Sequence, residues 1–519
     1  MTRELTMLPS PEMKQPPRSL RSLPPAGASV RLGRPGATEM LFAAMRAQGE
    51  RLALQQGDLR LSYREALHEV ALRAERLRSA GCRRVAIALD NGIDWALWDL
   101  AALQAGLVCV PLPGFFSAAQ QAHVLDSAGV DTLIIDDSTC FRPAGFGVTE
   151  GGIAQRHVDH PLTLPAGTVK ITYTSGSTGQ PKGVCLDAAA QMAVAGSLWQ
   201  ASRSCAIERH LCVLPLATLL ENIAGLYTPL LSGAAVDLIP MADIGLSGAT
   251  GFDVQRFLAV LQRSQPNSLI LLPQLLLMLV AAVERGAALP ASLRFIAVGG
   301  GRVSPGLLQR ADALGLPVFE GYGLSECASV VCLNTPEQRR IGTVGRPLPH
   351  ADVRIGPGGE VLVRGARMLG YLGEAGAADD WLDSGDLGHF EDDFLVLHGR
   401  SKHQFVTAYG RNVNPEWVEA ELVQQLPIAQ AWLHGEALPA NVAVLVPRGP
   451  GLSDDMLAAA VATVNRELPD YARVHHWLRA DEPFSAANGL ATPNGRLRRA
   501  ALLDRYRGAI DRRITAATL

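Results

Sequence analysis

The chain has 519 residues, of which 48% are hydrophobic and 19% charged, and its formal net charge is −3 at pH 7. This length predicts two or more domains with a sizeable core, and the small net charge gives no reason to expect nucleic acid as a partner. The 8 cysteines show no Cys-x-x-Cys spacing, which argues against a zinc site or a disulfide framework and favours reduced thiols.

The first segment of the chain is rich in proline and arginine and has no apolar period. We therefore expect a disordered tail over residues 1–35. The N-terminus also lacks an apolar stretch that ends in a small-residue cleavage site, so no secretory signal is expected. A cytoplasmic location is the resulting expectation.

The next part of the chain alternates between helix-length and strand-length apolar patterns. Residues 63–78 have helical spacing, and buried strands are expected at 84–89, 108–112, 131–135, 211–215 and 293–298. This alternation is typical of parallel sheets covered by helices. It predicts an α/β fold with a large N-terminal domain over residues 36–399.

The most apolar stretch, residues 268–283, contains Pro273 and is shorter than the roughly 20 residues that a spanning helix needs. It is interpreted as a buried strand, a turn and a core helix. No transmembrane segment is expected, and peripheral membrane contact is left open.

A new pattern begins near residue 400. A helix over 415–425, a strand over 441–446 and a helix over 454–468 predict a small α+β domain over residues 400–519.

Residues 172–183, with the sequence TYTSGSTGQPKG, are interpreted as a phosphate-binding loop. Glycines without a Cβ allow backbone N–H groups to converge on an anion, while the hydroxyls and a lysine add donors and charge. A solvated Ser/Gly turn is the alternative for the bare SGSTG part. A nucleotide-hydrolase P-loop is excluded, because Lys182 is followed by glycine rather than by Ser or Thr. The candidate nucleotide-binding residues are Thr174, Ser175, Gly176, Ser177, Thr178, Gly179 and Lys182.

This loop resembles the phosphate loop of the acyl-adenylate-forming superfamily, which contains acyl-CoA synthetases, peptide-synthetase adenylation domains and luciferases. Four further blocks follow in the family's order: residues 321–326 (GYGLSE), 383–386 (DSGD), 399–402 (GRSK) and 409–416 (YGRNVNPE). A sixth block, near residue 490, resembles the end of fatty acyl-CoA synthetases.

The resemblance implies a role for several residues in binding ATP and Mg²⁺. Glu326 stands where family members hold magnesium, and a hard cation prefers such oxygen ligands. Asp386 matches the ribose-binding aspartate, for which capping is the alternative role. Arg400 matches a second ribose contact. The other matched positions are Gly300, Gly301, Gly321, Tyr322 (near adenine), Gly323 and Ser325, although a plain turn is the alternative for the glycines at 300 and 301.

Lys402 stands at the family's hinge position, about which the small domain would rotate between two reactions. The sequence departs from the family at two other places. Arg496 replaces the adenylation lysine, which keeps the charge but changes its shape. An exposed arginine without a role is the alternative. In fatty acyl-CoA synthetases a histidine precedes the glutamate of this block by three residues. Here Thr218 stands in its place before Glu221, and we assign Thr218 no catalytic role.

The resemblance implies an ATP-dependent ligase with Arg496, Lys182 and Glu326 as catalytic groups. It would convert a carboxylic acid to acyl-AMP with release of pyrophosphate, and then transfer the acyl group to CoA. Residues 217–230 offer no aspartate for an amino group, so an apolar acid, favoured to be a long-chain fatty acid, is expected rather than an amino acid. Two alternatives stay open: a ligase that loads an acyl carrier protein, and a non-catalytic scaffold that binds nucleotide or acyl groups.

The sequence does not match the patterns of a serine hydrolase or of a metal site. The candidate nucleophile elbow at residues 323–327 ends in cysteine instead of glycine, which excludes a serine hydrolase of that type. The cluster at residues 157–160 (HVDH) could be drawn as a metal site, but it has no partner motif and is interpreted as solvated side chains.

Overall fold

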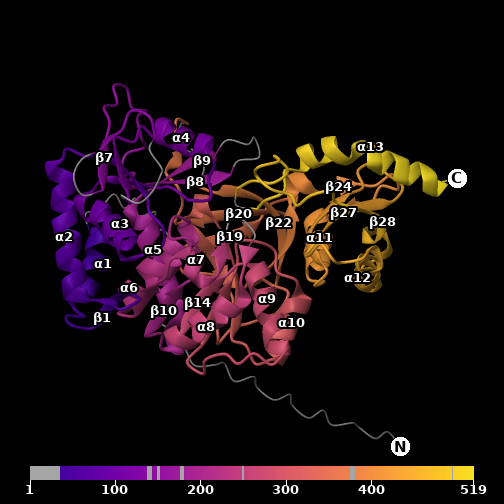
Figure 1. The fold of residues 1–519 in the computed structure, drawn as a ribbon, viewed down its shortest axis with the longest axis horizontal. Helices are drawn as coiled ribbons and strands as arrows, with labels where there is room; N and C mark the ends of the chain where they lie inside the picture. The colour runs from indigo at the N-terminus through magenta and orange to yellow at the C-terminus, as the bar shows by residue number, and fades with distance from the viewer. Residues whose placement is uncertain are drawn as a thin grey trace, which may run out of the picture. The chain divides into compact units, whose positions relative to one another are not determined.

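The computed structural model describes residues 36–136, 143–148, 152–175, 181–247, 251–374, 380–493 and 495–518. The tail predicted over residues 1–35 lies outside this part of the chain. Within it, two large sheets and their helices precede a four-stranded sheet and a smaller C-terminal unit (Figure 1).

The larger sheet has nine strands, and six neighbouring strands at its centre are parallel. Those six are, in order, β16 (Val318–Leu324), β15 (Phe295–Val298), β14 (Ser268–Leu271), β10 (Arg209–Cys212), β11 (Ala235–Leu238) and β1 (Leu52–Gln56). The antiparallel strands β17 (Ser329–Leu333) and β18 (Arg346–Pro347) extend one edge, and β2 (Leu59–Ser62) extends the other.

The second sheet has eight strands, with a parallel centre and antiparallel ends. Its order is β21 (Gly370–Tyr371), β9 (Pro181–Leu186), β8 (Lys170–Ser175), β4 (Val108–Pro111), β3 (Arg84–Ala88), β5 (Thr132–Ile135), β7 (Ile153–Gln155) and β6 (Gly147–Val148). One hydrophobic core includes side chains from both large sheets, because Val85 of β3 and Val236 of β11 belong to the same buried cluster.

Helices with apolar faces cover these sheets. Ser62 begins one of them with a capping box, in which its side chain accepts from the backbone N–H of Glu65 and the Glu65 side chain accepts from the Ser62 backbone. The helices before residue 320 are α1 (Gly36–Arg46), α2 (Tyr63–Ser79), α3 (Ile93–Ala105), α4 (Ala118–Ser127), α5 (Ala188–Ser202), α6 (Thr228–Ser232), α7 (Met241–Ile244), α8 (Val254–Ser264), α9 (Pro273–Glu284) and α10 (Pro305–Ala313). The short strands β12 (Leu246–Ser247) and β13 (Gly251–Phe252) pair between α7 and α8.

A π-helix, η2 (Glu221–Tyr227), immediately precedes α6 and is held by a buried polar network. Lys170 of β8 donates to Asp99 of α3 over 2.8 Å and to the Tyr227 hydroxyl over 2.9 Å, and it also donates to Asn222. Tyr227 and Asn222 in turn donate to the second Asp99 oxygen. The network therefore satisfies the buried charges and fixes the π-helix against the second sheet.

The C-terminal part begins after an antiparallel sheet made of β19 (Ala351–Ile355), β20 (Glu360–Gly365), β22 (Leu382–Glu391) and β23 (Phe394–Arg400). It contains β24 (Phe405–Val406), β25 (Asn412–Val413), α11 (Pro415–Val423), β26 (Ile428–His434), β27 (Asn441–Pro447), α12 (Asp454–Glu467), β28 (Val474–Arg479) and α13 (Arg499–Thr518). Strands β26, β27 and β28 form a sheet with hydrophobic clusters of its own.

The α/β fold with a large N-terminal and a smaller C-terminal domain is confirmed. The helix expected over 63–78 is α2, and residues 268–283 divide into β14 and α9 as expected. No helix of the described residues is long and apolar enough to cross a membrane.

The interpretation of residues 172–183 as one loop was too broad. Strand β8 continues to Ser175 and β9 begins at Pro181, with Thr174 opposite Lys182. Tyr173 and the β-branched threonines beside it suit a pleated strand, so the two arms pair instead of remaining in a loop.

Candidate active site

A cavity of about 400 Å³ extends along three parallel strands of the nine-stranded sheet. His210, Ser268 and Phe295 lie in register on β10, β14 and β15 and line one end of it. Residues 299–300, directly after β15, and residues 321–325 line the other end. The cavity therefore runs from the starts of the strands to their carboxyl ends, which is where α/β sheets commonly bind ligands.

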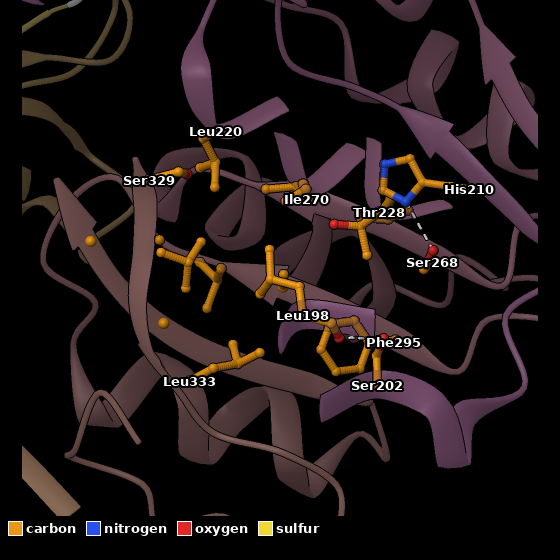
Figure 2. A pocket seen from close by; sticks show the side chains of 18 of the residues that line it. Leu198, Ser202, His210, Leu220, Thr228, Ser268, Ile270, Phe295, Ser329 and Leu333 are labelled. Carbon is orange, nitrogen blue, oxygen red and sulfur yellow. Dashed lines mark hydrogen bonds between the residues drawn. The ribbon is translucent and has the colours of Figure 1, made fainter. Parts of the chain in front are cut away.

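The walls between these ends are mostly apolar. Leu198 of α5, Leu220 before the π-helix, Ile270 of β14 and Leu333 of β17 contribute aliphatic side chains, and Figure 2 shows them with Phe295. Such walls favour an apolar body for the molecule that the cavity holds.

Tyr322, Asp386 and Arg400 meet beside the carboxyl end of β16. The Tyr322 hydroxyl donates to Asp386 Oδ2 over 2.7 Å, and Arg400 Nε lies 2.9 Å from Asp386 Oδ1. Burial raises the pKa of Asp386, although Arg400 and the Tyr322 hydrogen bond oppose this shift. Burial and the nearby Asp386 charge also raise the pKa of Tyr322, which keeps its hydroxyl protonated.

Glu326, Tyr371 and Lys182 form a second group. The Tyr371 hydroxyl donates to Glu326 Oε1 over 2.8 Å, and Lys182 Nζ lies 5.2 Å from the centre of the Tyr371 ring. Lys182 also contacts Glu374 over 3.3 Å, but about half of each side chain is exposed, so this ion pair contributes little stability.

Arg496 lines the same cavity as residues 321–325. Although the residue as a whole is exposed, its guanidinium is within electrostatic reach of Glu326, Asp386, Glu416 and Arg400. Arg496, which stands at the position of the family's lysine, therefore lies in the electrostatic field of these carboxylates.

Two of the predicted glycines have a structural requirement for glycine. Gly300 has a φ of +75°, which L side chains rarely adopt. A Cβ on Gly323 would overlap the Ser329 carbonyl oxygen and lie 2.7 Å from Val330 Cα. Gly321 lines the cavity, and Gly301 lies just beyond it next to Pro273.

Of the predicted phosphate loop, the structure describes residues 172–175 and 181–183, and of Ser175 only the backbone. Gly176, Ser177, Thr178 and Gly179 lie outside the described residues.

The profile of the AMP-binding enzyme family matches residues 41–372. The chain belongs to the AMP-binding enzyme family.

Curated members of this family with related sequences are acid–CoA ligases of several kinds. A 2-succinylbenzoate–CoA ligase of Bacillus licheniformis is 27% identical over 419 residues, which are 74% of this chain and 84% of that protein. A long-chain-fatty-acid–CoA ligase of Mycobacterium bovis is 28% identical over 471 residues, which are 72% of this chain and 75% of that protein. The predicted superfamily is confirmed, but its relatives are not limited to fatty acyl-CoA synthetases.

Solved structures of family members have the same fold. The O-succinylbenzoate coenzyme A synthetase of Bacillus subtilis in complex with AMP has a TM-score of 0.70 at 24% identity and covers 89% of this chain and 97% of its own. An anthranilate CoA ligase with anthranoyl-AMP has a TM-score of 0.73 at 17% identity, with 93% and 98% covered. The Bacillus subtilis enzyme has also been solved with ATP and magnesium, at a TM-score of 0.71, 23% identity and coverage of 89% and 98%.

The described residues fit a magnesium ion that is shared with phosphates. They contain no group of three or more His, Cys, Asp or Glu that could hold a metal alone. Magnesium in nucleotide sites uses one or two carboxylates together with phosphate oxygens, and the half-buried Glu326 can provide one. Ser325 precedes it and lines the cavity.

The polar end of the cavity was not predicted from the sequence. Glu221 does not pair with position 218, because Thr218 donates to the carbonyl of Pro215 over 2.7 Å. Its partner is His210, eleven residues earlier, at 3.3 Å. The spacing of residues 210 and 221 in the sequence does not predict this pair. The two side chains meet because the π-helix packs against β10.

Lys402 lies exposed in η4 (Ser401–His403), a short 3-10 helix between β23 and β24. The position is compatible with a hinge, and that role stays a prediction.

Proposed function

We propose that this protein is an AMP-forming acid–CoA ligase that activates an apolar carboxylic acid with ATP. One observation carries the proposal: Arg496 and Tyr322 line a mostly apolar cavity, Tyr322 donates to Asp386, and Arg496 is within electrostatic reach of Glu326, Asp386 and Arg400. The names of the curated relatives and the ATP, magnesium and acyl-adenylate complexes of the structural neighbours support the same reaction.

The chemical difficulty of the first step is the approach of two anions, the carboxylate and the α-phosphate of ATP. In the proposal, Arg496 draws them together, because a guanidinium can bridge a carboxylate and a phosphate. Lys182 and the phosphate loop bind the pyrophosphate that leaves. Bound magnesium would neutralise phosphate charge beside Glu326.

Asp386 and Arg400 would hold the ribose, with Tyr322 beside the adenine. The prediction carried from the sequence is that one Asp386 carboxylate accepts both ribose hydroxyls. In this structure its two oxygens already face Tyr322 and Arg400. Ribose binding would therefore have to share or replace these bonds.

For the second step we propose that residues 400–519 rotate about Lys402, so that a CoA thiol reaches the acyl-adenylate and AMP leaves. Rotation would allow one nucleotide site to serve two reactions in sequence. A carrier-protein thiol has the same chemistry and stays the alternative acceptor.

The test is pyrophosphate release from ATP and magnesium with a panel of fatty, aryl and amino acids, each with and without CoA. Release with an apolar acid that increases when CoA is added, together with an acyl-CoA product, is the expected result. Release without CoA stimulation would favour a carrier protein, and no release with any acid would favour the non-catalytic scaffold.

A further inference from the structure

Three polar residues form a chain at the inner end of the cavity. Ser268 Oγ lies 2.9 Å from His210 Nδ1, and His210 Nε2 lies 3.3 Å from Glu221 Oε1. Ser268 and His210 are each 3% exposed and line the cavity, while Glu221 is fully buried behind them. Figure 2 shows the His210 ring and Ser268 on the side opposite Leu220 and Ser329.

The backbone around these three hydrogen-bonded residues leaves room for their side chains. A Cβ on Gly225 would lie 2.9 Å from His210 Nε2 and would also collide with Glu221 Oε1, so glycine leaves the space that both side chains occupy. Gly225 and Glu221 belong to the π-helix, and helices of this kind occur frequently at functional sites. The Lys170 network fixes the same π-helix from its other side.

We infer that the acid is not purely apolar: its far end carries an uncharged oxygen that hydrogen-bonds to Ser268, whose hydroxyl His210 positions. This inference rests on the proposed function and names a class of substrate for the same site. Both ring nitrogens of His210 are already paired, so the hydrogen-bonding capacity left at this end of the cavity belongs to the Ser268 hydroxyl. A hydrocarbon chain ending in a methyl group would bury that hydroxyl without a further partner, which is costly.

The character of the far-end group follows from the direction of the hydrogen bonds. Where Glu221 Oε1 accepts the hydrogen bond between these two side chains, His210 Nε2 is its donor. With a neutral imidazole, Ser268 donates to Nδ1 and its oxygen accepts from the ligand; with a protonated one, Ser268 is free to donate. A hydroxyl fits both states, and a ketone fits the second. A second carboxylate is disfavoured, because burying its charge among the mostly apolar walls of the cavity would be costly.

The strands also set the spacing between the two ends. Phe295, in register with Ser268, precedes Gly299 by four residues, which corresponds to about 13 Å at roughly 3.3 Å per residue. In the proposal the reacting carboxylate lies at the end of the cavity lined by Gly299, so the acid would carry its oxygen about that far from it, which suits a chain of medium length.

The test measures kcat/KM for pyrophosphate release with matched acids: octanoic, 8-hydroxyoctanoic, 7-oxooctanoic and octanedioic acid, and the same four types at six and ten carbons. At the best length we expect the hydroxy acid to exceed the methyl-ended acid about tenfold or more. The dicarboxylic acid should be poorer than the hydroxy acid.

A pair of serine variants separates recognition from general damage. Ser268→Ala removes the hydroxyl that faces His210 and should lower the hydroxy-to-methyl ratio at least fivefold. Ser202→Ala is the matched control, because Ser202 lines the same cavity but donates to the Leu198 carbonyl over 2.9 Å. It should leave the ratio unchanged. His210→Gln, which keeps a polar side chain beside Glu221, should also lower the ratio.

A wild-type preference for the methyl-ended acid at every length would overturn the inference and leave the proposed function standing. Equal changes in the ratio for the two serine variants would overturn it as well. The absence of release with every acid would instead overturn the proposed function, and the inference with it.

Discussion

The Tyr322 hydroxyl donates a hydrogen bond to Asp386 over 2.7 Å, across 64 residues of sequence. This hydrogen bond joins the blocks 321–326 and 383–386, whose distance in space the family pattern does not predict. Asp386 also faces Arg400 at 2.9 Å, so its carboxylate is positioned from both sides.

Tyr322→Phe keeps the ring but removes this hydrogen bond. Because the freed carboxylate loses one of its two positioning contacts, we expect the KM for ATP to rise about tenfold, the scale of one lost hydrogen bond, with a much smaller change for the acid. Steady-state kinetics with each substrate varied will measure this. Tyr471→Phe, at a residue that is 43% exposed, is the control and should change neither KM. An equal rise of both KM values would contradict the positioning role.

Arg496→Ala should impair the first half-reaction selectively. Without the guanidinium nothing at this position offsets the repulsion between carboxylate and phosphate, so adenylation should fall at least 100-fold. Thioester formation from preformed acyl-AMP should fall less than tenfold, and Arg496→Lys should recover part of the adenylation rate. Equal loss in both half-reactions would refute the proposed role. Arg505→Ala, at a half-exposed residue of the C-terminal domain, is the control.

Glu326→Gln should weaken the response to magnesium, because an amide oxygen binds a hard cation less well than a carboxylate. The magnesium concentration for half-maximal rate should rise about tenfold, measured at fixed ATP. Tyr371→Phe removes only the 2.8 Å hydrogen bond to Glu326 and should give a smaller rise. An unchanged magnesium curve in Glu326→Gln would exclude this residue as a ligand.

Lys170→Met should destabilise the protein by about 3–5 kcal/mol, because it leaves the Asp99 charge buried without its cation. The double variant Asp99→Asn with Lys170→Met should lose less than Lys170→Met alone. Urea unfolding will measure both. Arg310→Met breaks an ion pair with Glu284 in which each side chain is more than a third exposed, and it should cost less than about 1 kcal/mol.

Glu320 makes stability depend on pH. Burial raises the pKa of this carboxyl from 4.5 to about 8, although the charge of Arg302 opposes the shift. Below pH 4.5 its contribution is fully present. As pH rises toward 8, the unfolded chain releases a proton that the folded protein keeps, so stability falls.

Glu320→Gln should therefore flatten the fall in melting temperature between pH 5 and pH 8. Glu467→Gln, at an exposed helix residue, should keep the wild-type slope. A wild-type slope in Glu320→Gln would show that other groups cause the dependence.

Local patterns were sufficient for much of the fold. The helical period of residues 63–78 and the strand-turn-helix pattern of 268–283 correspond to α2, β14 and α9. Motif order also selected Arg496, Glu326, Asp386 and Arg400 as candidate site residues. Arg496 lines the cavity and Asp386 pairs with Arg400, while the roles of all four stay predictions.

The remainder depends on contacts between distant segments. The loop is shorter than predicted because Thr174 pairs with Lys182. The β-branched residues of β8 favour a strand, but no local sequence rule specifies that β9 is its partner. His210 and Glu221 come together because the π-helix packs against β10. A lone histidine in an apolar strand gives no such signal.

The glycine at position 225 also limits how this pocket can change. Replacing His210 with an aliphatic residue alone would strand the Glu221 carboxylate in the core, and enlarging Gly225 alone would collide with both side chains. A variant line moving toward acids with plain hydrocarbon tails must therefore alter the histidine and the glutamate together before the glycine can be filled. Single-step libraries would miss that route, whereas paired libraries at 210 and 221 would open it.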